Sequence, residues 1–268
     1  MKKFITMIAL VLTLAFSVLA VSCGARNEQV DVTTKTVTVG YTDYAPMNYE
    51  EDGVLKGFDT ELAIMTFNAL GYDVRFKLID WANKYVELEA GNIDCIWNGF
   101  TANSEDDGIP RNQKVDFTAY YMENNQCVIR HKNTAEVTEI SQFNGKSIAF
   151  ENGSAGEGYV DTLEGISINK KGFAAQLNAV MNVNNGTAQY AVVDRTLAER
   201  YVGKNDYANL VINEGIEIPV EYYAVGFKKG SELTQKVNVM FKAFEDTGVM
   251  LEIANKYNLA TRLVEIDF

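Results

Sequence analysis

The sequence is poor in the residues that build metal and redox centres. It has one histidine, His131, and three cysteines among 268 residues, with no group of them at the spacing of metal ligands. It also has no catalytic serine–histidine or cysteine–histidine arrangement, no phosphate-binding loop and no short tandem repeat. We therefore expect no metal and no cofactor, and any ATP hydrolysis linked to this chain would belong to a partner.

Basic residues are also scarce relative to acidic ones. The chain has 24 Lys and Arg against 36 Asp and Glu, a net charge of −12, so we expect no nucleic acid partner. Its residues are 47% hydrophobic and 22% charged, as in globular proteins. The length suits one large domain or two ordinary ones.

The amino-terminal segment has the pattern of a secretory signal. Lys2 and Lys3 precede an uncharged apolar run from Phe4 to Val21, so we expect a signal peptide over residues 1–22. The residues from Leu19 to Cys23 resemble the lipobox of bacterial lipoproteins, which implies a lipid on Cys23 and attachment to the outer face of the cell membrane. A plain signal peptide or an uncleaved anchor helix is the alternative.

The segment after Cys23 is polar and predicts a tether over residues 23–36. Without the signal the chain has 22 basic against 36 acidic residues, a net charge of −14, so only the lipid would hold it at the membrane. The other two cysteines, Cys95 and Cys127, lie in apolar, strand-like runs. Buried free thiols are favoured over a disulfide, since no pattern places the two within bridging distance.

Hydrophobic patterning predicts two similar α/β units. Each alternates strands and helices at the spacing of a parallel α/β sheet. The predicted elements of the first unit are strands Val37–Tyr41, Val74–Ile79 and Asp94–Asn98 and helices Phe58–Leu70 and Ala82–Ala90. Those of the second are strands Ser147–Glu151, Ile166–Asn169 and Gln189–Val193 and helices from Ala155 to Leu163 and Ala174–Met181. Two extended runs, Gln126–Arg130 and Pro219–Lys228, suggest that the chain leaves the first domain, builds the second and returns.

The stretch from Asp94 to Thr118 is the first candidate for a binding site. Its short apolar run ends at Asn98-Gly99, which predicts a buried strand that emerges at a sheet edge. Arg111 follows after a polar loop, and a guanidinium beside a strand end is suited to a bidentate contact with a carboxylate. Such an arginine could equally be a solvated surface charge.

Several short motifs occur in order along the chain: Tyr44-Ala45-Pro46, Gly57-Phe58-Asp59-Thr60-Glu61-Leu62, Gly91-Asn92-Ile93-Asp94, Val115-Asp116-Phe117-Thr118 and Val192-Val193-Asp194. Together they resemble the extracytoplasmic solute-binding proteins that supply polar amino acids to ABC importers (solute-binding protein family 3). The resemblance extends from about Val37 to Asn258.

The family implies a two-lobed α/β fold of the periplasmic-binding-protein type (type II), with two extended hinge strands. Lobe 1 would comprise residues 37–125 and 222–268, and lobe 2 residues 126–221. The lobes would close on a free amino acid, and the closed protein, a monomer, would dock on a membrane permease.

The resemblance also implies roles for individual residues. Arg111 would bind the α-carboxylate of the ligand, together with the backbone N–H groups of Ser154 and Ala155, in the turn after Gly153 where a helix begins. Asp194, the Gly99 carbonyl and the Thr101 hydroxyl would hold the α-ammonium. The remaining predicted site residues lie around the ligand side chain: Tyr44 and Trp81 as its two walls, Asn98 and Phe100 beside them, and Asp43 as a specificity residue.

The loop between Thr101 and Arg111 is longer than in the family, and Ala155 stands where many relatives have a threonine. The loop acids and the run Glu50, Glu51 and Asp52 are most simply solvated. Two other functions stay open: an exported dehydratase on the same fold, with Asp43 as its acid, and a module that binds a receptor. The ligand is equally open among glutamine, cystine, histidine, arginine and lysine.

Overall fold

The computed structural model describes residues 35–268. The predicted signal peptide, Cys23 and almost all of the predicted tether lie outside the described residues, so the predictions for them stay predictions. None of the helices in residues 35–268 has the length and apolar character needed to cross a membrane.

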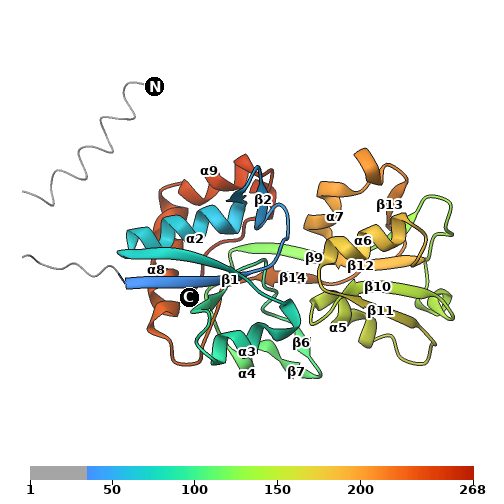
Figure 1. The fold of residues 1–268 in the computed structure, drawn as a ribbon, viewed down its shortest axis with the longest axis horizontal. Helices are drawn as coiled ribbons and strands as arrows, with labels where there is room; N and C mark the ends of the chain where they lie inside the picture. Colours follow the sequence, from blue (N-terminus) through green and yellow to red (C-terminus); the bar gives the residue numbers. More distant parts are fainter. Residues whose placement is uncertain (1–34) are drawn as a thin grey trace, which may run out of the picture. The chain divides into compact units, whose positions relative to one another are not determined.

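The first of two main sheets has the strand order β4-β1-β5-β15-β8. Its strands β4, β1 and β5 are parallel, whereas β15 is antiparallel to β5 and β8. The helices α2, α8 and α9 pack together beside it (Figure 1). Its strands are β1 (Lys35–Tyr41), β4 (Tyr72–Leu78), β5 (Cys95–Ile96), β8 (Asp116–Phe117) and β15 (Gly226–Phe227), and its helices are α2 (Phe58–Ala69), α3 (Lys84–Glu89), α4 (Arg111–Lys114), α8 (Glu232–Asp246) and α9 (Val249–Lys256).

The second main sheet has the order β11-β10-β12-β9-β13. Strand β10 is parallel to both β11 and β12, and β9 is antiparallel to β12 and β13. Helices α5 and α6 pack on β10 and β12. The strands are β9 (Met122–His131), β10 (Ser147–Glu151), β11 (Asn169–Phe173), β12 (Tyr190–Asp194) and β13 (Leu210–Asn213), and the helices are α5 (Ala155–Asp161), α6 (Gln176–Asn184) and α7 (Arg195–Tyr201).

Two extended segments connect the sheets, as predicted. Strand β14 (Val220–Tyr223) lies antiparallel to the first half of β9, with Val220 opposite Asn125 and Tyr223 opposite Met122. Both strands run between the two groups of elements in Figure 1. The remaining elements are the hairpins β2 (Tyr49–Glu51)–β3 (Val54–Lys56) and β6 (Glu105–Asp106)–β7 (Ile109–Pro110) and the short 3-10 turns Trp81–Asn83, Ile140–Phe143, Asn205–Tyr207 and Ala260–Arg262.

Most predicted elements are confirmed, and β10 agrees at both ends. The predicted strand Ile166–Asn169 is wrong, because the strand there begins at Asn169 and ends at Phe173. Ile166 and Ile168 instead pack against a buried cluster of the second sheet from a loop. Cys95 and Cys127 are buried as free cysteines, as favoured from their context.

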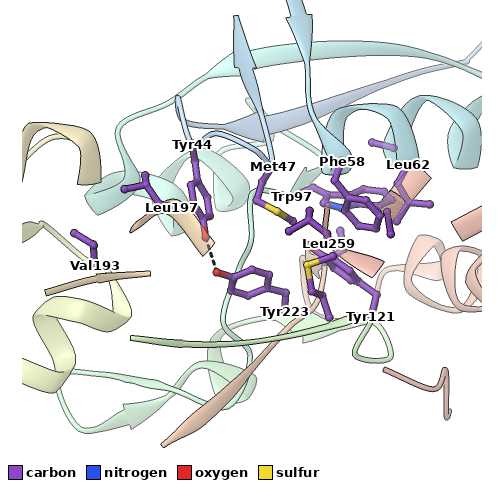
Figure 2. Packing of buried hydrophobic residues seen from close by; sticks show 14 of the residues in the cluster. Tyr44, Met47, Phe58, Leu62, Trp97, Tyr121, Val193, Leu197, Tyr223 and Leu259 are labelled. Atoms are coloured by element: carbon purple, nitrogen blue, oxygen red, sulfur yellow. Dashed lines mark hydrogen bonds between the residues drawn. The ribbon is translucent and has the colours of Figure 1, made fainter. Parts of the chain in front are cut away.

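The largest buried cluster includes side chains from both sheets. Figure 2 shows Tyr44, Tyr121 and Tyr223 from segments that are far apart in the sequence. Trp97 packs edge-on against Phe67 and Phe241, with ring centroids 5.9 and 5.5 Å apart. These aromatic contacts hold Trp97 in place, and Trp97 directly precedes the strand end Asn98-Gly99.

The motif glycine Gly57 permits a close approach that no other residue allows. Its φ is 125°, and a Cβ at this position would lie 2.1 Å from the carbonyl oxygen of Met47. We predict that Gly57→Ala lowers the free energy of unfolding by about 2 kcal/mol. Gly53→Ala is the matched control, since its φ is 73° and no atom lies within 4 Å of the added Cβ. Equal losses in urea unfolding would contradict the steric explanation.

Candidate functional site

A polar cavity lies where segments from both sheets meet. Only about 10 Å³ of it is open to the centre of a water molecule, so its side chains lie close together. Carboxylate, guanidinium, amide and hydroxyl groups face it, a composition suited to a small zwitterion rather than an apolar ligand. Its lining residues are Tyr44, Trp81, Asn98, Gly99, Thr101, Arg111, Glu151, Ser154, Ala155, Gln176 and Asp194.

The turn after β5 is stabilised by hydrogen bonds to buried side chains. The Gly99 N–H donates to Oδ2 of Asp59 at 2.6 Å, and Gly99 has a φ of 54°, which favours glycine. Asn98 accepts hydrogen bonds from the backbone N–H and hydroxyl of Thr42 and donates to the Thr42 carbonyl oxygen. Because these contacts use the Asn98 side chain, it positions the turn as well as lining the cavity.

The two predicted aromatic walls occupy different surroundings. The hydroxyl groups of Tyr44 and Tyr223 are 2.6 Å apart (Figure 2). Burial raises the pKa of Tyr44 well above its ordinary value, with Asp194 adding to the rise. Trp81 is 5% exposed and packs edge-on against Phe100, with ring centroids 5.3 Å apart.

Arg111 begins α4 and is 1% exposed. Its Nε and Nη2 both donate to Oδ1 of Asp106, at 2.9 and 2.8 Å. Its Nη1 donates to the Thr101 carbonyl oxygen, and Nη2 also donates to the Gly153 carbonyl oxygen across the cavity. The guanidinium therefore contacts a carboxylate of its own chain in addition to facing the cavity.

Asp106 comes from the long loop, which forms the β6–β7 hairpin and packs on α5. The prediction that the loop acids are solvated is wrong for Asp106, whose side chain is 13% exposed. Burial alone would raise its pKa, but the charges of Arg111 and Lys84 outweigh burial and hold the pKa below its usual value. Tyr85 also donates to Asp106.

Lys84 is a second buried cation beside the cavity, and sequence reasoning did not find it. It lies 1% exposed in α3 and donates to the Gly153 carbonyl oxygen at 2.8 Å. Burial, followed by the charge of Arg111, lowers the pKa of Lys84 to about 7. The Gly153 carbonyl oxygen thus accepts hydrogen bonds from two side chains, Lys84 on α3 and Arg111 on α4.

Asp194 ends β12 and is surrounded by amides. Its Oδ1 accepts from Asn124 and Gln126, and its Oδ2 accepts from Gln176. The same two amides, Asn124 and Gln126, also donate to Glu221 of β14. Burial and the nearby Asp194 raise the pKa of Glu221 to about 8. This network links the end of β12 to both connecting strands.

Glu151 ends β10, the strand next to β12, and also lines the cavity. It is 3% exposed. Burial, and next the charge of Asp194, raise the pKa of Glu151 to about 8. Since parallel strands end at one edge of a sheet, the two carboxyl groups share one side of the cavity.

The turn before α5 differs in part from the prediction. The Ser154 N–H donates to the Glu151 carbonyl oxygen at 3.2 Å, and the Gly153 N–H donates to the Glu157 side chain. The Ser154 hydroxyl caps α5 by accepting from the Glu157 N–H. Of the two predicted backbone donors, Ser154 and Ala155, the Ala155 N–H at the helix start is the one left to face the cavity.

Nine of the twelve predicted ligand-binding residues line the cavity. Asp43 does not, because the alternating backbone directs Thr42 and Tyr44 inward and leaves Asp43 exposed. Phe100 lies behind the lining, under the Arg111 guanidinium at 5.2 Å, and Gly153 contributes its carbonyl to Lys84 and Arg111. Glu151 and Gln176 were missed, although a charged residue that ends a buried strand was a signal for Glu151.

The sequence profile of the bacterial extracellular solute-binding proteins, family 3, matches residues 37–260. The chain belongs to this family. The arginine-binding extracellular protein ArtP of Bacillus subtilis is 25% identical over 262 residues, which are 96% of this chain and 98% of ArtP.

Solved structures of solute-binding proteins agree with this assignment. The arginine-, lysine-, histidine-binding protein ArtJ of Geobacillus stearothermophilus is 29% identical, with a TM-score of 0.75 over 83% of this chain and 95% of ArtJ. A substrate-binding protein of an ABC uptake transporter from Streptococcus pneumoniae, solved with histidine, is also 29% identical, with a TM-score of 0.72 over 83% and 92% of the two chains. This family 3 protein has their two-lobed fold, and its named relatives are binding proteins rather than enzymes.

Proposed function

We propose that this family 3 protein binds a free amino acid in the cavity and delivers it to the permease of an ABC importer. The observation that carries the proposal is that Arg111 and Asp194 reach one small cavity from opposite sheets. A zwitterion removed from water needs both a cation and an anion as partners, since an unpaired buried charge costs several kcal/mol.

We further propose that the lobes separate to admit the ligand by bending within β9 and β14. The space open in the cavity is too small for an amino acid, and these two strands cross between the sheets. The predicted lobe boundaries, near residues 125 and 221, fall inside these strands. We also propose, from the sequence of residues 1–36, that Cys23 carries a lipid that attaches the protein to the outer face of the cell membrane.

The test is a thermal-shift screen of the purified protein against the amino acids and cystine. A ligand present at about 100 times its Kd adds about 2.7 kcal/mol of stability, so we expect a clear rise in melting temperature with one or a few amino acids. Asp194→Asn should remove most of that rise, because the α-ammonium loses its charged partner.

Asp161→Asn is the matched control, since Asp161 is exposed and pairs with Lys170 at the surface. The melting temperature of each variant is compared with and without ligand, which separates a loss of binding from a loss of stability. A flat profile with every amino acid would exclude the proposed function.

A further inference from the structure

The Glu151 carboxyl group differs from the other buried acids around the cavity in having no partner. No hydrogen bond to its carboxylate oxygens occurs within residues 35–268, and no basic nitrogen of that range lies within 4.0 Å of them. Asp194, by contrast, accepts from three amides, and Asp106 accepts from Arg111. The Glu151 oxygens are not among the fully enclosed polar atoms that lack a partner within residues 35–268, so they open onto the cavity that Glu151 lines, where a ligand can donate to them.

The protein's own cations near Glu151 are occupied elsewhere. The charged groups that act on it are Asp194, Lys84, Arg111 and Asp80. Lys84 donates to the Gly153 carbonyl oxygen, and Arg111, which pairs with Asp106, is the cation that the proposed function assigns to the ligand α-carboxylate. Two carboxyl groups, Glu151 and Asp194, therefore line the cavity beside Arg111, the one cation among the lining residues within 35–268.

A ligand α-ammonium pairs with Asp194, which leaves the Glu151 carboxyl group available for a second donor of the same ligand. We propose that Glu151 is a specificity residue that accepts the cationic end of a basic amino acid side chain, a guanidinium or an ammonium, while Asp194 holds the α-ammonium. This inference rests on the proposed function and narrows its ligand to amino acids that carry two positive charges.

Ligand binding is then linked to proton release. Because burial and Asp194 raise the pKa of Glu151 to about 8, the carboxyl holds its proton at neutral pH when no cation is beside it. A bound guanidinium or ammonium favours the carboxylate, so the proton leaves to solvent as the ligand binds.

The test uses isothermal titration calorimetry with arginine and with citrulline, its neutral analogue of similar shape. We expect the protein to bind arginine more tightly than citrulline by about 30-fold or more, and Glu151→Gln to weaken arginine binding by about the same factor. Citrulline binding should change by about threefold or less, because the amide of Gln can pair with a neutral ureido group. Glu164→Gln, which alters an exposed acid of the same lobe, should change neither.

Titrations at pH 7 in two buffers of different ionisation enthalpy measure the number of protons that are released when the ligand binds. We expect proton release with arginine and none in Glu151→Gln. Unchanged arginine affinity in Glu151→Gln, or equal affinity for arginine and citrulline in the unmodified protein, would overturn the inference and leave the amino acid-binding function standing. A protein that binds no amino acid would overturn both.

Discussion

Replacing Asp106 by alanine is expected to lower the free energy of unfolding by about 3–5 kcal/mol, the cost of breaking a buried ion pair. Asp106 accepts hydrogen bonds from both Nε and Nη2 of Arg111, which is 1% exposed. Lys84, also 1% exposed, lies 4.0 Å from the other oxygen of the same carboxylate. Alanine would leave two buried cations without their shared anion.

Urea unfolding with a double-mutant cycle tests this expectation. Arg111→Met alone leaves Asp106 without its main cation, so the double variant should lose less than the sum of the single variants by about 1–3 kcal/mol. Asp161→Ala removes an acid from the exposed pair with Lys170, and we expect a loss of at most about 1 kcal/mol. A loss for Asp106→Ala as small as that of the control would show that the ion pair is not essential.

The role of Asp106 shows where sequence reasoning fails. The acids of the long loop predict solvent exposure, because their neighbours in sequence are polar. The loop instead forms the β6–β7 hairpin, which places Asp106 on a buried arginine that is only five residues further along the chain. Neither the hairpin nor the direction of the side chain can be deduced from composition, since both depend on α5 packing against the hairpin.

The fold itself was largely predictable because buried parallel strands and amphipathic helices leave clear patterns. The exception, β11, is instructive. It is an edge strand that pairs only with β10, and its residues Asn169–Phe173 are mostly polar, so its pattern is that of a loop. The apolar run just before it led to the prediction, although Ile166 and Ile168 are partly buried against the cluster without being part of the sheet.

The candidate site was predictable where a family motif marks a residue and hard to predict where residues contact one another. Arg111, after the polar loop, and Asp194, at the end of Val192-Val193-Asp194, were named from the resemblance, and both line the cavity. The amides that surround Asp194 could not be named, because Asn124 and Gln126 lie on β9 and Gln176 begins α6, both far from Asp194 in the sequence. Their contacts depend on how β9, β12 and α6 pack.

Asp59 is the second residue whose loss should have a large effect. It is 0% exposed, and its carboxylate accepts from the Gly99 N–H at 2.6 Å and from the Tyr121 hydroxyl at 2.9 Å. We expect Asp59→Ala to lower the free energy of unfolding by about 3 kcal/mol, because both donors are left buried without an acceptor. The motif Gly57-Phe58-Asp59 therefore stabilises the site. Its glycine permits the close turn, its phenylalanine packs in the core, and its aspartate accepts the hydrogen bond from the Gly99 N–H.

Asp59 should also make stability depend on pH, with a sign that follows from its environment. Burial raises the pKa of Asp59 to about 7, although the hydrogen bonds from Gly99 and Tyr121 oppose the rise. Between about pH 4 and 7 the folded protein then holds a proton that the unfolded chain releases, so this contribution to stability is full at low pH and is lost as the pH rises. Asp59→Asn cannot ionise and lacks this contribution, while the other raised groups, Glu151 and Glu221, are the same in both proteins.

The difference in unfolding free energy between the unmodified protein and Asp59→Asn isolates this one carboxyl group. We expect the unfolding free energy of the unmodified protein minus that of Asp59→Asn to fall by up to about 1.4 kcal/mol per pH unit as the pH rises from 5 to 7. The measurement is a series of urea unfolding curves at matched ionic strength. The asparagine keeps an acceptor for the Gly99 N–H, and its amide N–H can donate to the Tyr121 hydroxyl oxygen in a hydrogen bond of reversed direction, so the variant should stay folded where Asp59→Ala is strongly destabilised. Parallel stability curves across this range would mean that the carboxyl is already ionised at pH 5, and that the Gly99 turn rests on a charged acceptor rather than a neutral one.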